Sequence, residues 1–425
     1  MSSYLNVSTE QLYKEAEESF GFKVTNITNN PDFGIKIEHV SLGDVPHNKK
    51  LALFLSKMLF HFKVVVYPHQ NDLLPMQYTE YAKQFAKKDK FSAVFYTKGE
   101  NGPANTSKQG GVGSNSATPW RYKEGEAQLM VISNIDNKSL GNGLLQWRGL
   151  NYERFQLDFS KISDRAIFGL DGEATHKANT MNGAAHYHTD MTFEKEPGSN
   201  TMLFCKSIPD DQTRGGQTTF IDMKRAYEEL PGDLKAIADN AICGHAKRPT
   251  LGMIMVDGDV KLGKDQTRNG QKGEAHGLGV YWNSIDGKPV ENLINEAVTY
   301  HPLVRPHPVT GEKSLYSPCG TNVGVVGMSN IESFDFLSKI MKHCMQVKYR
   351  YDHQYTVGDI VHYDTNLSLH RANPLPSASQ PKDTRILLRI SNQGVNDNLF
   401  GEISTYSEGL HYNVRPDAIV VKSKI

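Results

Sequence analysis

The stretch His186–Phe193, near the middle of the chain, contains residues that could bind a metal ion. Within it, His188 and Asp190 are two residues apart. On a β-strand the side chains of residues i and i+2 project from the same face, so both could reach one ion. A second histidine would complete a set of two histidines and one carboxylate, which leaves half of an octahedral coordination sphere open. We therefore take a metal centre with open positions as the working hypothesis.

The spacing alone does not select this site. A chain with 16 histidines and 47 acidic residues should contain roughly two His-x-acid triplets by chance, and two occur. The second is His362-Tyr363-Asp364, which we interpret as structural. His186 would face the same side as His188 and is a rival ligand, although we expect it to lie in the pocket wall.

Composition narrows the class of partner. The chain has 425 residues, 38% of them hydrophobic, and its 47 basic residues equal its 47 acidic residues, so the formal net charge is zero. This balance is not typical of a nucleic-acid-binding protein, and no basic amphipathic helix indicates a membrane surface. We therefore expect a small-molecule partner. Whether the chain also forms a homo-oligomer is left open.

The expected location is the cytoplasm. The four cysteines are widely scattered, which indicates free thiols in a reducing compartment. We see no secretory signal and no apolar run of the roughly 20 residues that span a membrane. The last residues, Ser423-Lys424-Ile425, differ by one residue from the peroxisomal Ser-Lys-Leu signal, which gives a weaker alternative.

The pattern of elements predicts a β-rich α+β protein. Ser8 and Gln11 fit a capping box, so we expect residues 1–30 to form an N-terminal helical extension packed on the main body. A helix over 49–62, a strand over 64–67 and a helix over 74–87 follow. Further short strands are expected near 128–135, 201–207, 216–221, 300–305, 313–316, 359–364 and 385–390.

Many short strands with long excursions between them favour a jelly-roll-like double sheet with flanking helices. We expect residues 31–425 to form one catalytic domain with insertions near 99–119, 136–181 and 257–279. Long loops in compact domains are usually functional or disordered. The insertion at 136–181 directly precedes the proposed metal strand, so it is either a lid or an insertion without a role.

Five stretches together resemble the taurine dioxygenase (TauD/TfdA-like) family of Fe(II)/2-oxoglutarate-dependent oxygenases, which are built on a double-stranded β-helix. His188-Thr-Asp-Met-Thr-Phe193 is similar to the family's His-Thr-Asp-x-Thr-Phe signature. The other four follow in the family's order: Gly215-Gly-Gln-Thr218, His301-Pro-Leu-Val-Arg305 with His307-Pro308, Leu369-His-Arg-Ala-Asn373, and Arg385-Ile-Leu-Leu-Arg389.

The resemblance implies a role for individual residues. It makes His188, Asp190 and His370 the iron ligands. It makes Arg385 the partner of the distal carboxylate of 2-oxoglutarate, with a hydrogen bond from Thr218. It places Arg389 near the primary substrate, where we also expect the side chains of His186, Met191 and Phe193.

Elementary chemistry agrees with these roles. Three protein ligands leave two positions for a chelating 2-oxo acid and one for O2. A carboxylate is best held by a planar, permanently charged donor, which arginine supplies. Arg385 and Arg389 are four residues apart, so on a strand they would share one face.

Departures from the family's pattern affect the substrate. Gln217 replaces the aspartate of the family's Gly-Gly-Asp-Thr, and Ala184 stands where taurine dioxygenase has an asparagine. Iron and cosubstrate are therefore expected to carry over, whereas taurine is not.

The expected function is oxidation of a C–H bond in a small anionic substrate, by hydroxylation, desaturation or oxidative cyclisation. The anion could be a carboxylate, a sulfonate or an amino-acid derivative. Two alternatives stay open: a non-catalytic jelly-roll module that binds a metal, and a protein-lysine demethylase. The first does not need an arginine aimed at the metal, and the second usually holds its cosubstrate with lysine.

Overall fold

We describe the protein from a computed structural model. The structure describes residues 7–87, 116–120, 129–133, 187–194, 196–246, 253–254, 279–280, 298–319, 321–328, 330–373, 385–396 and 399. The predicted insertion at 136–181 lies outside these residues, and so do most of those at 99–119 and 257–279. The described residues correct one prediction. Most of Ser116–Trp120 was expected in the first insertion, but the segment forms strand β4, which pairs with β5.

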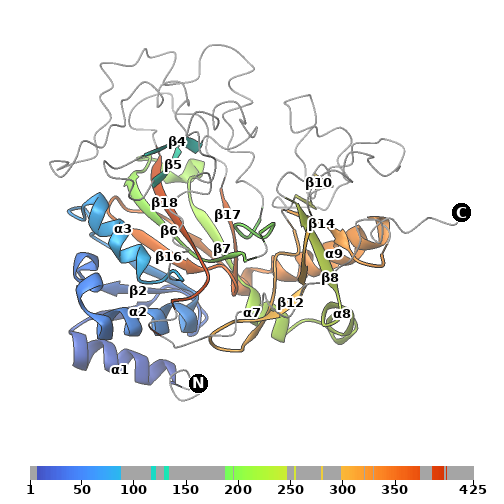
Figure 1. Cartoon of the computed structure of the whole chain (residues 1–425), viewed down its shortest axis with the longest axis horizontal. Helices are drawn as coiled ribbons and strands as arrows, with labels where there is room; N and C mark the ends of the chain where they lie inside the picture. The colour runs from blue at the N-terminus through green and yellow to red at the C-terminus, as the bar shows by residue number, and fades with distance from the viewer. Residues whose placement is uncertain are drawn as a thin grey trace, which may run out of the picture.

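The largest sheet has eight strands, and most of them are antiparallel to their neighbours; β2 and β3 run parallel. Its strands β18, β6 and β16 lie side by side in the middle of the molecule (Figure 1). In spatial order the strands are β1 (Lys23–Asn26), β2 (Ile35–Glu38), β3 (Val64–Tyr67), β16 (Ile360–Asp364), β6 (Gly198–Ser207), β18 (Ile386–Gln393), β5 (Leu129–Ser133) and β4 (Ser116–Trp120).

Two three-stranded sheets lie beside it. The first has the order β15 (Arg350–His353), β7 (Thr218–Asp222), β17 (Ser368–Ala372), and the second has the order β11 (Val298–Pro302), β8 (Ile242–Ala246), β14 (Asn322–Val325). Two strand pairs complete the described sheets: β12 (Val304–Pro306) with β13 (Lys313–Leu315), and β9 (Met253–Ile254) with β10 (Gly279–Val280).

Helices cover the outer faces. α1 (Thr9–Phe20), α2 (Lys49–Phe62) and α3 (Pro75–Lys83) pack on the large sheet, while α7 (Met223–Glu228), α8 (Gly232–Ala238) and α9 (Asn330–Cys344) lie toward the other end of the molecule (Figure 1). Short 3-10 helices lie at Leu42–His47, Gln212–Arg214 and Val347–Tyr349. Among the described residues, no helix has the length and apolar character that a membrane crossing would need.

Local sequence explains where several helices begin. α1 starts with the predicted capping box, in which the Ser8 side chain accepts from the Gln11 backbone and the Gln11 side chain accepts from the Ser8 backbone. Asp222, at the end of β7, accepts from the Arg225 backbone and caps α7. α2 ends at Lys63, which has a left-handed backbone conformation.

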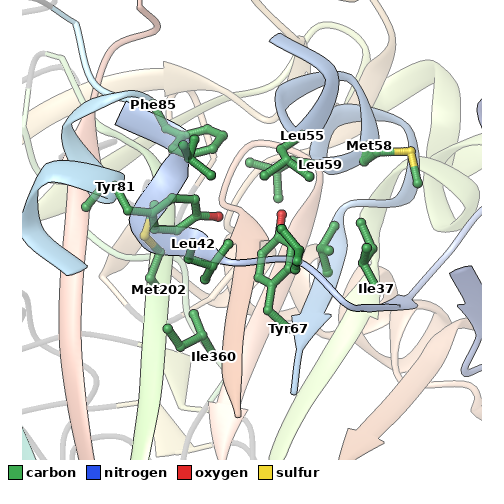
Figure 2. Packing of buried hydrophobic residues seen from close by; sticks show 14 of the residues in the cluster. Ile37, Leu42, Leu55, Met58, Leu59, Tyr67, Tyr81, Phe85, Met202 and Ile360 are labelled. Atoms are coloured by element: carbon green, nitrogen blue, oxygen red, sulfur yellow. The ribbon is translucent and has the colours of Figure 1, made fainter. Parts of the chain in front are cut away.

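Strand alternation divides the core of the large sheet into two layers. On one face, Met202, Phe204 and Ile360 pack under α2 and α3. Figure 2 shows Leu55 and Leu59 of α2 and Tyr81 of α3 gathered over Tyr67 and Ile360 of the sheet.

On the opposite face of the large sheet, Leu203, Val361, Tyr363 and Leu387 pack against Phe220 of β7. The sheet containing β7 and β17 therefore lies against the large sheet, and the residues between them form an inner core.

Several elements lie where the sequence predicted them. The helix over 49–62 and the strand over 64–67 have the bounds that were expected, and α1 packs on the main body through Leu12 and Ala16. β1, inside the predicted extension, was missed, and it pairs with β2 at the edge of the large sheet. The described architecture is β-rich and mixed, with several sheets; the jelly-roll connectivity and the division at residue 30 stay predictions.

Candidate metal centre

His188 and His370 come together through a backbone bridge. The two residues form an isolated antiparallel pair, in which the N–H of His188 donates to the His370 carbonyl at 2.8 Å and the reverse bond is 3.1 Å. His370 belongs to β17, so this bridge fastens His188 to the edge of the smaller sheet. The two imidazole rings lie with their centroids 4.3 Å apart.

Asp190 completes the predicted set. Its Oδ1 lies 3.7 Å from His188 Nε2, and its Oδ2 lies 3.9 Å from His370 Nε2. The three potential ligand atoms lie within 4.8 Å of one another, and this is the one such group found among the described residues. Two imidazoles and one carboxylate, converging from one side, are the donor set that suits a non-haem Fe(II) ion with open positions. The residues therefore fit the metal that the sequence predicted.

Charge explains how Asp190 stays ionised although its side chain is almost completely buried. Burial raises the pKa of a carboxyl group, because it disfavours the charged form. Here the positive charge of Arg389 opposes that effect, as do His370, His188 and a hydrogen bond from Thr201, and the pKa of Asp190 falls to about 2. Asp190 is consequently available as an anionic ligand at neutral pH.

Tyr363 is a neighbour of the metal set that the sequence analysis did not identify. Its hydroxyl oxygen lies 3.1 Å from His370 Nε2, and the side chain is completely buried. Burial, reinforced by the charge of Asp190, holds the pKa of Tyr363 well above its ordinary value, so the phenol is neutral. Because side chains alternate along the strand at 360–364, Tyr363 lies on the same face as Val361. This alternation is the sequence signal that could have identified Tyr363.

Arg385 lies in the inner core with Thr218, as the resemblance implied. The Arg385 side chain is almost completely buried (1% exposed), and its NH2 donates to Thr218 Oγ1 at 3.4 Å. Tyr355 joins the same group, since its hydroxyl lies 2.8 Å from Thr218 Oγ1 and its ring lies 5.6 Å from the Arg385 guanidinium carbon. Tyr355 was missed because it is 137 residues from Thr218 in sequence, and no local pattern marks it.

The electrostatic character of this group is cationic. Burial lowers the pKa of Arg385, an effect partly offset by Tyr355 and Cys205. Arginine nevertheless remains protonated in proteins. A cation in such an environment is best stabilised by an anion that brings hydrogen-bond acceptors.

Arg389 shares the face of the ligands, as strand spacing predicted. Its NH1 lies 3.3 Å from Asp190 Oδ1, and its side chain is 17% exposed. Arg389 therefore lies at the edge of the metal set.

The other predicted substrate contacts are only partly described. Met191 is buried and has a positive φ of 62°, so the chain turns sharply after Asp190. Phe193 follows in the same turn and is half-buried. His186 lies outside the described residues. A substrate-binding role for these residues stays a prediction.

Comparison with known proteins agrees with the site. The model of the "Taurine catabolism dioxygenase TauD, TfdA family" matches residues 145–391, which is more than half of the chain and includes every candidate site residue. The chain belongs to this family. The resemblance stated from the motifs is thus confirmed, and the family requires Fe(II), 2-oxoglutarate and O2, as predicted.

Individual relatives are distant. An alpha-ketoglutarate-dependent 2,4-dichlorophenoxyacetate dioxygenase of Cupriavidus pinatubonensis is 26% identical over 52% of this chain and 67% of its own length. An (S)-phenoxypropionate/alpha-ketoglutarate-dioxygenase of Sphingobium herbicidovorans is 30% identical over 46% of this chain and 58% of its own length. The chain thus matches these curated relatives over about half of its own length and at most about two thirds of theirs.

Solved structures show the same fold. The structure of AAD-2 in complex with Mn(II) and N-oxalylglycine superimposes with a TM-score of 0.56, at 19% identity, and covers 88% of this chain and 98% of that chain. At this level of identity the similarity concerns the fold.

Proposed function

We propose that this protein is an Fe(II)/2-oxoglutarate-dependent oxygenase that oxidises a C–H bond of a small anionic substrate. One observation carries the proposal: the buried Arg385 donates to Thr218 of β7, the strand that pairs with β17 and His370, and Arg389, four residues further along, pairs with Asp190. A metal set and an anion-binding group on these neighbouring strands suit the two ends of a chelating 2-oxo dicarboxylate.

The metal set would hold Fe(II) through one nitrogen of each histidine and one oxygen of Asp190. When bound, Fe(II) with 2-oxoglutarate and O2 supplies the oxidant that attacks a C–H bond. The protein's part is to keep the three ligands on one side, so that the other positions stay open. Burial of the set among aromatic side chains such as Tyr363 and Phe220 excludes water from this side.

Arg385 would bind the far carboxylate of the cosubstrate. Its guanidinium offers a planar pair of donors, and the hydroxyls of Thr218 and Tyr355 provide further hydrogen bonds. This arrangement also argues against a metal-binding module without activity, because such a module has no need for a buried cation next to its metal.

Arg389 is the proposed partner of the substrate's anionic group. In this structure it pairs with Asp190, and a divalent cation would take over the neutralisation of that carboxylate. The guanidinium could then pair with a carboxylate or sulfonate, with Met191, Phe193 and His186 forming nearby walls. The names of relatives, which include phenoxy acids and sulfate esters, support an anionic substrate. Hydroxylation, desaturation and oxidative cyclisation all remain compatible with this site.

We also propose that the two packed sheets form the double-stranded β-helix expected of the family. Their inner core, with Phe220 facing Tyr363 across it, supports this. A cytoplasmic location and a homo-oligomeric state stay predictions.

An anaerobic titration tests the proposal. Fe(II) is added to the full chain with and without 2-oxoglutarate, and the weak visible charge-transfer band of the chelate is measured. We expect the band in the wild type. In Arg385→Gln we expect 2-oxoglutarate affinity to fall about 100-fold, because one partner of a buried charge pair is lost, while Fe(II) affinity is unchanged.

Arg371→Gln is the matched control. Arg371 is also buried, and it lies on β17 next to His370, where alternation directs it to the opposite face and over the Tyr187 ring. The control should keep its 2-oxoglutarate affinity. Absence of the band in the wild type would refute the proposed function, and an unchanged band in Arg385→Gln would refute the cosubstrate assignment.

A further inference from the structure

His188 and Asp190 lie in a segment with little regular structure of its own, and a turn leads into the strand that carries His370. Residues 187–194, which we call the ligand turn, make one isolated bridge at His188 and then turn. On the other side, the turn at residues 365–367 joins β16, which ends at Asp364, to β17 and His370. Ligand positions must be held closely for a metal to bind well, so these turns need partners elsewhere.

The ligand turn is fastened by one region of the chain. The Thr299 hydroxyl donates to the Phe193 carbonyl at 2.6 Å, and the Cys319 thiol donates to the Tyr187 carbonyl at 3.0 Å. His301 Nε2 lies 3.1 Å from the Glu194 carbonyl, and the hydroxyls of Thr192 and Thr321 are hydrogen-bonded to each other. These four contacts reach the ligand turn on both sides of His188 and Asp190.

The same region fastens the turn before His370. His307 Nε2 lies 2.9 Å from Asp364 Oδ2, and both side chains are completely buried. Asp364 Oδ1 in turn accepts from the backbone N–H groups of Asn366 and Leu367, at 2.7 and 3.1 Å. The Ser314 hydroxyl donates to the Asn366 carbonyl at 2.6 Å.

The hydrogen-bond network fixes the protonation of both histidines. His307 Nδ1 accepts from the backbone N–H groups of Val309 and Thr310, so its proton is on Nε2 and is donated to Asp364. His301 Nε2 faces a carbonyl, so it too must be a donor. Burial, together with Arg305, lowers the pKa of His301 to about 3, so the ring is neutral and has one proton for this bond.

We propose that Thr299, His301, His307, Ser314, Cys319 and Thr321 form a bracket that positions the two halves of the metal set relative to each other. His301 and His307 are its positioning residues. The inference rests on the proposed function. It gives a role to the His301-Pro-Leu-Val-Arg305 and His307-Pro308 motif, because His301 contacts the ligand turn and His307 contacts Asp364, before the turn that leads to His370.

The bracket is itself anchored in separate strand pairs. Thr299 and His301 lie on β11, which pairs with β8, whereas Ser314 lies on β13, which pairs with β12. His307 lies between them and packs on Phe60 of α2, with ring centroids 4.8 Å apart. The bracket therefore connects the metal set to two sheets and one helix.

Co(II) binding to the metal-free full chain tests the bracket, with affinity and coordination geometry read from visible absorption. We expect His301→Leu and His307→Leu each to weaken Co(II) binding about tenfold to 100-fold, the range for partners that orient metal ligands. His301→Gln and His307→Gln keep an N–H donor at a similar reach. Both Gln variants should bind Co(II) with an affinity within about threefold of the wild-type value.

His362→Leu is the matched control, because His362 is also a completely buried histidine, but its ring nitrogens bond Tyr81 and Asn200, which belong to neither turn. The unfolding temperature of the metal-free protein should fall in all three Leu variants, whereas Co(II) affinity should fall only in the two bracket variants. If His307→Leu does not fold, Ser314→Ala removes one tether and should weaken binding about threefold.

The outcomes separate two failures. If the wild type binds Co(II) and both bracket Leu variants bind it equally well, the bracket is wrong and the proposed function is unaffected. The same conclusion follows if affinity merely tracks the unfolding temperature, His362→Leu included. If the wild type binds no Co(II), the metal centre is wrong, and the bracket with it.

Discussion

Two triplets in this chain have the same residues at the same spacing but differ in their surroundings. In the first, His188 and Asp190 converge with His370, and the His188 side chain is 16% exposed. In the second, His362 and Asp364 are both completely buried in the strand β16. Their comparison shows what turns a His-x-Asp pattern into a candidate metal centre.

The side chains of the second triplet are hydrogen-bonded to other groups of the protein. His362 bonds the Tyr81 hydroxyl at 3.1 Å and the Asn200 side-chain oxygen at 3.0 Å, so both ring nitrogens are used. Asp364 accepts from His307 and from two backbone N–H groups. These contacts make the second triplet a structural element, as the sequence analysis interpreted it.

The first triplet keeps its ligand atoms together because of its cross-strand partner. The bridge with His370 brings in a third donor that is 182 residues from His188 in sequence, and the charge of Arg389 keeps Asp190 ionised. The two triplets therefore differ in the surroundings of their side chains and in the residues that lie opposite them. Their spacing is the same.

The largest expected effect separates the two aspartates. Asp190→Ala should reduce Co(II) or Fe(II) binding below detection, because it removes one of three ligands. Asp364→Ala should keep measurable binding, weakened about tenfold to 100-fold through the bracket, and should lower the free energy of unfolding by about 3 kcal/mol because buried donors lose their acceptor.

Metal titration and urea unfolding of both variants measure this difference. Loss of metal binding in Asp364→Ala, with retention in Asp190→Ala, would mean that the metal lies at the second triplet.

A smaller effect concerns the pH dependence of stability. Burial lowers the pKa of His362 to about 3 from an ordinary 6.5. The unfolded chain thus binds a proton between these values that the folded chain does not, so His362 makes the folded state less stable as pH falls through this window. Between about pH 7.5 and pH 5 the wild type should lose about 2 kcal/mol more than His362→Gln.

Urea unfolding of both proteins at the two pH values gives the difference, and the other buried histidines cancel in the subtraction. Equal losses would show that His362 is protonated in the folded protein.

The smallest effect concerns a hydroxyl beside the first triplet. Thr201 Oγ1 lies 3.4 Å from Asp190 Oδ2, to which it can donate, and 2.9 Å from Ser391 Oγ. Thr201→Val keeps the shape of the side chain but removes these bonds, so Co(II) affinity should fall about threefold. Thr219→Val is the control, since Thr219 is buried in the adjacent sheet and bonds Asp352 and Asn373. Equal effects in both variants would show that Thr201 does not act on Asp190.

Much of the fold followed from local patterns. The apolar spacing over 49–62 and the capping box at Ser8 are short-range signals, and the structure has these elements where they were expected. Strands β8, β15 and β17 were not identified, because a short buried strand has no periodicity of its own and depends on pairing with distant residues.

The sequence by itself determined the composition of the metal set, because the His188-Thr-Asp190 motif and the four stretches after it occur in the order of one family. It also determined that Arg385 and Arg389 share a face, since alternation along a strand is a local property.

Only the tertiary structure shows why the first triplet can hold a metal and the second cannot, because that depends on which residues lie opposite each one. It also brought Tyr355 to Thr218 and Tyr363 to His370, and it joined the ligand turn and the turn before His370 to one region through His301 and His307. The physical reason is that side chains far apart in sequence meet only when sheets pack, and packing depends on the whole chain.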